Sequence, residues 1–153
     1  METYNEKQIK LNREINAMRE QAHQSFNAKR VELARLKEET GHVFEQEKKR
    51  LAEQLNDCLM ARLEMKSTGF ECTHIRMREN YENERRIHEL QNANRNAFLG
   101  KLRDIARQNN ENTEQYRAEK MKIANYKAER LLQIEREECE RKLLSLQNEE
   151  TKD

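Results

Sequence analysis

Proline and tryptophan are absent from this 153-residue sequence, and glycine occurs only three times. Proline and glycine interrupt helices and build most tight turns, so their scarcity predicts few turns and few breaks in regular structure. Aromatic residues make up only 5% of the chain. No apolar run approaches the roughly 18 residues that a membrane-spanning helix needs. These absences argue against a β-rich domain and against a membrane protein.

Cysteine is also scarce. Cys58, Cys72 and Cys139 are an odd number of widely separated residues without C-x-x-C spacing, so no disulfide framework is expected. The segment 1–7 lacks the apolar stretch of a secretory signal peptide. We therefore expect a soluble chain in the cytoplasm with reduced thiols.

The charged residues are abundant but balanced. Lys and Arg number 30 and Asp and Glu number 29, a net charge of +1, with the two signs interleaved along the chain. This balance argues against broad electrostatic attraction to nucleic acid, and we expect neither a specific nucleic acid nor a membrane as a partner. Charged residues make up 39% and hydrophobic residues 35%, too little apolar material for an ordinary globular core. Because strong helix formers dominate, we expect an all-α fold of one or more extended, long helices without a globular core.

Apolar residues recur at helical spacing in the first third of the chain. They begin with 3/4 spacing, as in heptads, and then recur every eleven residues from Leu11 through Leu33 to Leu55. The pattern predicts a coiled coil with heptad and eleven-residue stretches, whose apolar seam binds a partner. The predicted partner-binding seam comprises Leu11, Ile15, Met18, Ala22, Phe26, Leu33, Leu36, Phe44, Leu51 and Leu55.

Few places could interrupt a single elongated helical chain over 1–153. Thr3 and Glu6 have capping-box spacing, which predicts a helix start. A bend or break is possible at 67–70, where Gly69 weakens the helix by about 1 kcal/mol, although a continuous helix that tolerates this glycine is equally compatible. The polar stretch 108–113 is a weaker candidate for an interruption.

The sequence carries no recognisable catalytic or cofactor-binding motif. Phosphate-binding glycine loops, H-E-x-x-H and G-x-S-x-G are all absent. Cys72 and His74 form the closest approach to a metal-binding cluster, but zinc needs four converging ligands. We therefore expect neither an enzyme nor a cofactor or metal site.

The stretch 90–110 is unusually basic, because Asp104 is its only acidic residue. Apolar residues at helical spacing gather on one side of the same predicted helix. The stretch therefore forms a short, basic amphipathic segment, which predicts a docking patch. An acidic protein surface, an anionic membrane and a calmodulin-type partner are the candidate ligands, and a solvated helix flank is the alternative without function. The predicted basic docking patch comprises Arg95, Phe98, Lys101, Leu102, Arg103, Ile105 and Arg107.

The stretch 128–144, AERLLQIEREECERKLL, is rich in Glu and Arg and punctuated by Leu. In composition it resembles the helices of ciliary and axonemal coiled-coil proteins of the trichoplein and filament-forming type. The resemblance implies a structural component of the cytoskeleton in the axoneme of a cilium or flagellum. It also implies partners among other coiled-coil proteins and tubulin, within a large multiprotein assembly. The alternatives are a coiled-coil adaptor or tether in trafficking or signalling, and a helix regulated in the manner of calmodulin targets.

Overall fold

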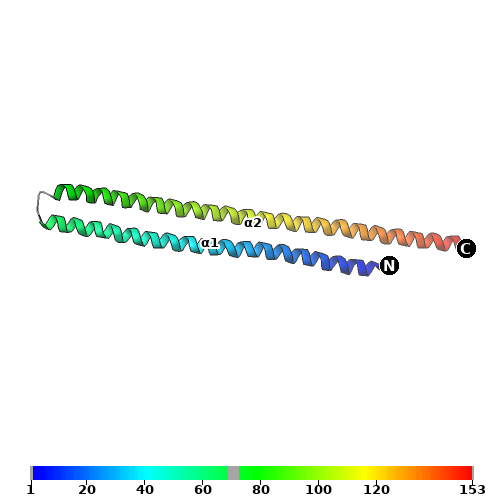
Figure 1. The fold of residues 1–153 in the computed structure, drawn as a ribbon. Coiled ribbons are helices and arrows are strands. Elements are labelled where there is room, and N and C mark those ends of the chain that lie inside the picture. The colour runs from blue at the N-terminus through cyan, green and yellow to red at the C-terminus, as the bar shows by residue number, and fades with distance from the viewer. Residues whose placement is uncertain (1, 69–72, 153) are drawn as a thin grey trace. The chain divides into compact units, whose positions relative to one another are not determined.

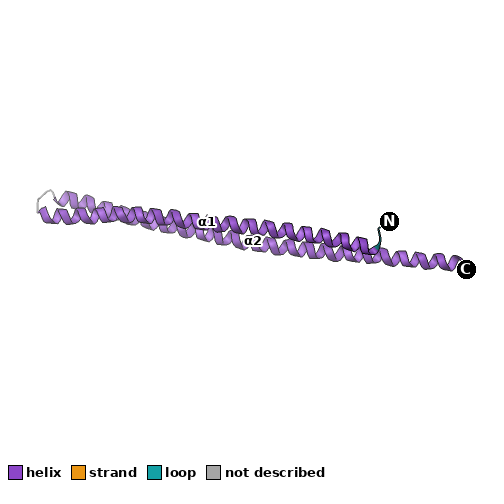
Figure 2. Cartoon of the chain, turned by 90° about the horizontal axis from the view of Figure 1, so that it is seen from below, coloured by secondary structure: helices purple, strands orange, loops and turns teal. Residues whose placement is uncertain are grey.

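The computed structural model describes residues 2–68 and 73–152, and nearly all of them are α-helical. Helix α1 spans Tyr4–Thr68 and helix α2 spans Thr73–Lys152 (Figure 1). Within these described ranges no strand occurs, and Figure 2 accordingly shows helix almost throughout. The expected all-α fold is confirmed.

The start of α1 confirms the predicted capping box. The Thr3 backbone N–H donates to Glu6 Oε2, and the Glu6 N–H donates to Thr3 Oγ1, each over 3.2 Å. The Lys7 N–H donates to the Thr3 carbonyl over 3.0 Å. These bonds satisfy amide groups that the first turn of a helix otherwise leaves without partners.

The possible bend at 67–70 falls at the end of α1. Residues 67 and 68 are the last two residues of α1, which ends at Thr68. Gly69 and residue 70 lie outside the described residues. Because α2 begins at Thr73, the two helices are separated close to the position where the sequence allowed a break.

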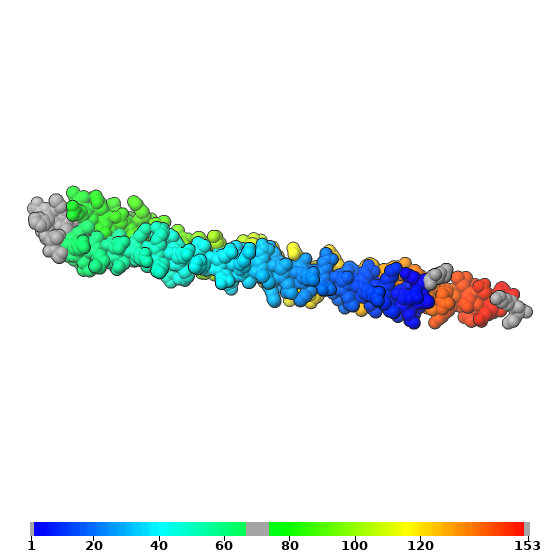
Figure 3. Space-filling model, turned by 60° about the horizontal axis from the view of Figure 1, so that its bottom comes forward, coloured from blue at the N-terminus to red at the C-terminus, as the bar shows by residue number. Residues whose placement is uncertain are grey.

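The chain divides into two units, and each contains one segment of both helices. Unit 1 comprises Met1–Val31 with Asn110–Asp153, and unit 2 comprises Glu32–Asn109. Within each unit, residues with higher numbers on α1 contact residues with lower numbers on α2. The two segments are therefore antiparallel. Figure 3 shows the packed surface of the segments of unit 2, coloured cyan to green.

Unit 1 is held together by an apolar cluster between its two segments. Leu11 and Ile15 of α1 are buried with Ile123 and Ile134 of α2. Partly buried residues pack around this cluster: Tyr4, Met18, Ala22, Tyr126 and Leu131. Burial of one Leu or Ile side chain contributes about 1.5–3 kcal/mol, so these four residues are the main source of stability in unit 1.

Unit 2 has the same construction. Leu33 and Leu51 of α1 and Ile87 and Ile105 of α2 are buried. Phe44 and Phe98 stack across the two segments, with ring centroids 4.3 Å apart. We call the residues of one helix that face the other helix the seam.

Three asparagines of α2 join the seam by hydrogen bonds to backbone carbonyls of α1. Asn80 Nδ2 donates to Cys58 O over 3.0 Å, and Asn94 Nδ2 donates to Phe44 O over 3.3 Å, both within unit 2. Within unit 1, Asn112 Nδ2 donates to Phe26 O over 3.2 Å.

The residue numbers of the two partners add up to 138 in all three asparagine bonds, which defines one antiparallel register for each unit. The same register places Leu33 opposite Ile105 and Leu51 opposite Ile87.

The buried aliphatic residues other than Leu11 and Ile134 repeat every 18 residues along each helix. On α1 this spacing separates Ile15, Leu33 and Leu51, and on α2 it separates Ile87, Ile105 and Ile123. The eleven-residue intervals expected from the sequence are parts of this longer repeat. Eighteen residues make five turns at about 3.6 residues per turn, so a seam with this period stays on one face of a helix without supercoiling.

The polar stretch 108–113 is helical, in contrast to the expected weak interruption. Asn112, within this stretch, is buried, and its amide is satisfied by the carbonyl of Phe26. A polar residue with a hydrogen-bond partner fits a helix interface, so this stretch is part of the interface of unit 1.

Candidate interaction surfaces

The predicted partner-binding seam is covered by the chain's own second helix. Leu11, Ile15, Leu33 and Leu51 are buried. Met18, Ala22, Phe26, Phe44 and Leu55 are partly buried. Leu36 differs from the others, because 42% of its surface remains exposed. The sequence identified the residues that face a helix, but that helix belongs to the same chain.

The predicted basic docking patch is divided between the inside and the outside of unit 2. Its apolar residues turn toward α1: Ile105 is buried, Phe98 stacks on Phe44, and Leu102 is partly buried. Its charged residues are exposed: Arg95, Lys101, Arg103 and Arg107. The structure therefore does not bring the apolar and basic residues together on one accessible face.

Asp104, the only acid in this stretch, is bound within α2. Arg107 forms an ion pair with it, and Gln108 Nε2 donates to Asp104 Oδ2 over 3.0 Å. The hydrogen bonds from Arg107 and Gln108 lower the pKa of the Asp104 carboxyl. Asp104 thus stays ionised and paired at neutral pH.

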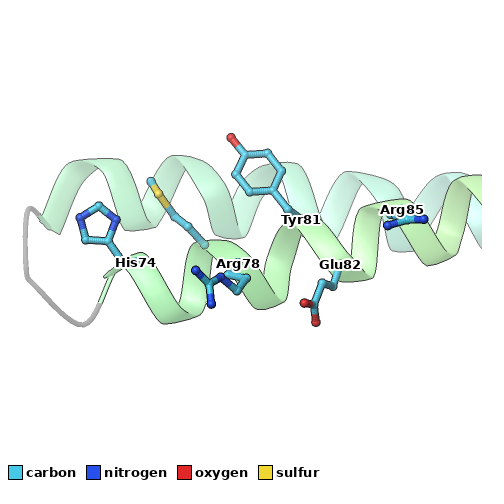
Figure 4. Close-up of a pocket in the computed structure, with 6 residues that line it drawn as sticks. His74, Arg78, Tyr81, Glu82 and Arg85 are labelled. Carbon is cyan, nitrogen blue, oxygen red and sulfur yellow. The ribbon is translucent and has the colours of Figure 1, made fainter.

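A shallow groove lies near the start of α2 in unit 2. Its lining residues are His74, Met77, Arg78, Tyr81, Glu82 and Arg85, shown in Figure 4. The Arg62 guanidinium of α1 lies 4.7 Å from the centroid of the Tyr81 ring and also pairs with Glu84. Sequence reasoning missed this groove, because its residues recur at helical spacing outside the apolar seam.

Unit 1 carries two polar contacts between its segments. Lys7 Nζ lies 2.8 Å from Glu137 Oε2, and this contact lowers the pKa of Glu137. The Tyr126 hydroxyl donates to Glu14 Oε1 over 2.6 Å, and this bond raises the pKa of Tyr126. Both contacts join the two segments of unit 1, and Lys7 and Glu137 also line a groove beside Tyr4 and Ile134.

An aromatic cluster also lies between the two segments of unit 1. Phe26 and Tyr116 stack with ring centroids 4.6 Å apart, and Lys120 Nζ lies 4.4 Å from the centroid of the Tyr116 ring. His23 Nδ1 is 3.3 Å from the Tyr116 hydroxyl. Phe26 and Tyr116 are partly buried, so their rings form part of the interface between the two segments of unit 1.

Neither metal-binding nor membrane-spanning features were found in the part of the chain that the structure describes. Over 2–68 and 73–152, no three His, Cys, Asp or Glu side chains converge as a metal ion would require. Neither described helix has a stretch that is both long and apolar enough to cross a bilayer. Cys58 is a partly buried free thiol and Cys139 an exposed one.

No protein-family model, curated protein or solved structure matches this chain. The resemblance to axonemal coiled-coil proteins therefore stays a prediction based on the composition of the stretch 128–144.

Proposed function

We propose that this chain is a structural protein without enzymatic activity that binds other proteins as a component of a cytoskeletal assembly. We infer that its helices form an intramolecular antiparallel coiled coil with an 18-residue repeat. The favoured host is the axonemal microtubule of a cilium or flagellum. Tubulin and other coiled-coil proteins are the proposed partners, and the cytoplasmic cytoskeleton is the proposed location.

The observation that carries this proposal is the closure of the seam within the chain. Because α2 covers Leu11, Ile15, Leu33 and Leu51, the helices use their strongest apolar residues for their own pairing. A partner then contacts the outer surface, which is mostly charged. That surface also displays large apolar side chains that are more than half exposed: Ile9, Val31, Val43, Met60, Leu63, Ile75, Tyr81, Met121, Leu132, Leu143, Leu144 and Leu146. Exposed apolar residues within a charged surface suit contacts with a protein surface.

The alternatives require the seam to be open. An adaptor that self-associates through the stripe from Leu11 to Leu55 competes with α2 for the same residues. A calmodulin-type target needs Phe98, Leu102 and Ile105 to leave α1, at a cost of about 1.5–3 kcal/mol for each large apolar side chain exposed. The closed seam favours an outer-surface structural role over both.

Sedimentation with assembled microtubules tests the proposal. The full-length chain should pellet with microtubules and stay in the supernatant without them. A variant with Leu63→Ser and Ile75→Ser, which alters two exposed side chains, should keep its helical circular dichroism and thermal unfolding but pellet less. A chain that stays in the supernatant with microtubules, and also with axonemal coiled-coil proteins, contradicts the proposed host.

A further inference from the structure

The charges of unit 2 are sorted between its two sides. A plane through the seam divides each helix lengthwise into two halves. Each residue is turned by about 100° from the one before it, so its distance in sequence from a seam residue determines the half on which it lies. Arg62 of α1 contacts Tyr81 and Glu84 of α2, so the halves that carry these three residues lie on the same side. We call this side the basic side, for the residues described next.

On α1, the half that carries Arg62 is predominantly basic. Lys48 precedes the seam residue Leu51 by three positions, which places it on the half that carries Arg62. By the same geometry this half has only two acidic residues, Glu38 and Glu45. Its basic residues are Lys37, Lys48, Lys49, Arg62 and Lys66.

On α2, the half that carries Tyr81 is also basic. Its only acidic residue is Glu84, which is already paired with Arg62. Its basic residues are Arg85, Arg95 and Arg103, whereas Arg78, nine residues before Ile87, lies on the outer ridge. Arg85 pairs with Glu89 of the opposite side over 3.5 Å. Two residues of the predicted docking patch, Arg95 and Arg103, therefore belong to the basic side, whereas Lys101 and Arg107 lie on the opposite side. Across both helices the basic side has eight basic residues and three acidic ones.

The opposite side of unit 2 has the reverse balance. Its acidic residues on α1 are Glu32, Glu39, Glu47, Glu53, Asp57 and Glu64, and those on α2 are Glu79, Glu82, Glu89 and Asp104. Against these ten stand six basic residues: Arg35, Arg50, Arg76, Arg86, Lys101 and Arg107. Three of the six are paired locally: Arg35 with Glu39 over 3.7 Å, Arg50 with Glu47 over 2.5 Å, and Arg107 with Asp104.

We propose that the basic side of unit 2 is a docking surface for an acidic surface of a protein partner. Only the identity of that partner as the microtubule rests on the function proposed above. Complementary charge steers association and fixes which side of a protein faces its partner. The acidic opposite side then faces away from the partner.

A protein is favoured over a nucleic acid because of the apolar side chains on the same side. Leu59 and Leu63 lie on the half of α1 that carries Arg62, and both are exposed. Tyr81 of α2 is half exposed and lines the groove in Figure 4. These side chains gain from contact with apolar protein surface, whereas a phosphate backbone offers them none.

Two full-length variants with the same net charge test the proposal. The first carries Lys37→Gln, Lys48→Gln, Arg95→Gln and Arg103→Gln on the basic side. The matched control carries Arg35→Gln, Arg76→Gln, Arg86→Gln and Lys101→Gln on the opposite side. Glutamine keeps the helix propensity and most of the side-chain length. The probes are assembled microtubules and, independently, a fluorescent glutamate-rich peptide followed by anisotropy.

The basic-side variant should bind the glutamate-rich peptide about tenfold more weakly than the wild-type chain, while the control changes less than threefold. Equal losses in both variants, or no binding by the wild-type chain, overturn the docking surface. Tighter wild-type binding to duplex DNA than to the peptide overturns the protein partner. If the peptide distinguishes the variants but no chain pellets with microtubules, the docking surface stands and the proposed host fails. Microtubule binding that is equal in all three chains, without peptide discrimination, supports the host and overturns the surface.

Discussion

Replacing Asn112 by Asp tests whether the asparagine bonds contribute to the pairing of the helices. The Asn112 side chain is buried and donates through Nδ2 to the carbonyl oxygen of Phe26 over 3.2 Å. An ionised aspartate has nearly the same shape but no donor, so it loses a hydrogen bond worth about 0.5–1.5 kcal/mol. It also leaves a buried acceptor facing a carbonyl, at a further cost of about 1–3 kcal/mol. We expect a total loss of about 1.5–4.5 kcal/mol in the free energy of unfolding at pH 7.

The pH dependence gives this prediction a distinctive signature. Burial and the facing carbonyl should raise the pKa of the introduced carboxyl above its ordinary value, because both disfavour its ionised form. Below that raised pKa the protonated carboxyl can again donate to the Phe26 carbonyl. The difference in stability between the variant and the wild-type chain should therefore shrink as the pH falls from 7 toward 4.

Urea unfolding followed by far-ultraviolet circular dichroism measures both effects. Asn110→Asp is the matched control, because Asn110 is exposed and lies two residues away on the same helix. The control should change stability by less than about 0.5 kcal/mol. The reasoning is refuted if the two variants lose equal stability, or if the loss at Asn112 does not depend on pH.

Three further predictions concern other contacts. Leu51→Ala, at a site with 0% exposure, should cost about 2–5 kcal/mol in urea unfolding, whereas Leu59→Ala on the surface should cost far less; equal costs would contradict the assigned seam. The Glu137→Gln variant should be less stable than the wild-type chain near neutral pH. This difference should vanish as the pH falls through the lowered pKa of Glu137, because that carboxylate stabilises the fold only while it is ionised. Tyr126→Phe should destabilise the chain below pH 10, and the difference should disappear as the pH rises through the raised pKa of Tyr126, because the hydroxyl stabilises the fold only while it is protonated; pH-independent differences in either variant would exclude these titrations as the cause.

Much of the helical structure could be predicted from local signals. The capping box at Thr3 and Glu6 depends on residues three positions apart, and the scarcity of proline and glycine acts on each turn separately. Apolar side chains at helical spacing predict Leu11, Ile15, Leu33 and Leu51 as seam residues, and all four are buried.

The identity of the partner helix could not be predicted in this way. An apolar helix face indicates that another surface covers it. A second copy of the chain, another protein or a later segment of the same chain would bury it equally well. The decisive signal is the matched 18-residue repeat in α1 and α2, and it is partly hidden by polar seam residues. Asn80 and Asn112 lie in the seam although they are polar, because an amide bonded to a backbone carbonyl fits these positions as well as an apolar side chain does. A pattern of apolar residues alone therefore does not predict them.

The repeat also determines which changes in length the helix pair can absorb. A deletion in one helix alone shifts every later seam residue relative to its partners across the interface. Paired deletions of 34–51 from α1 and 87–104 from α2 would remove one complete repeat from each helical segment of unit 2. The remaining partners would stay in register. Each such step shortens the pair by about 27 Å, at 1.5 Å per residue. The length of this protein is thus adjustable in modules, and lineages or designed variants should differ by whole repeats added or removed in both helices together.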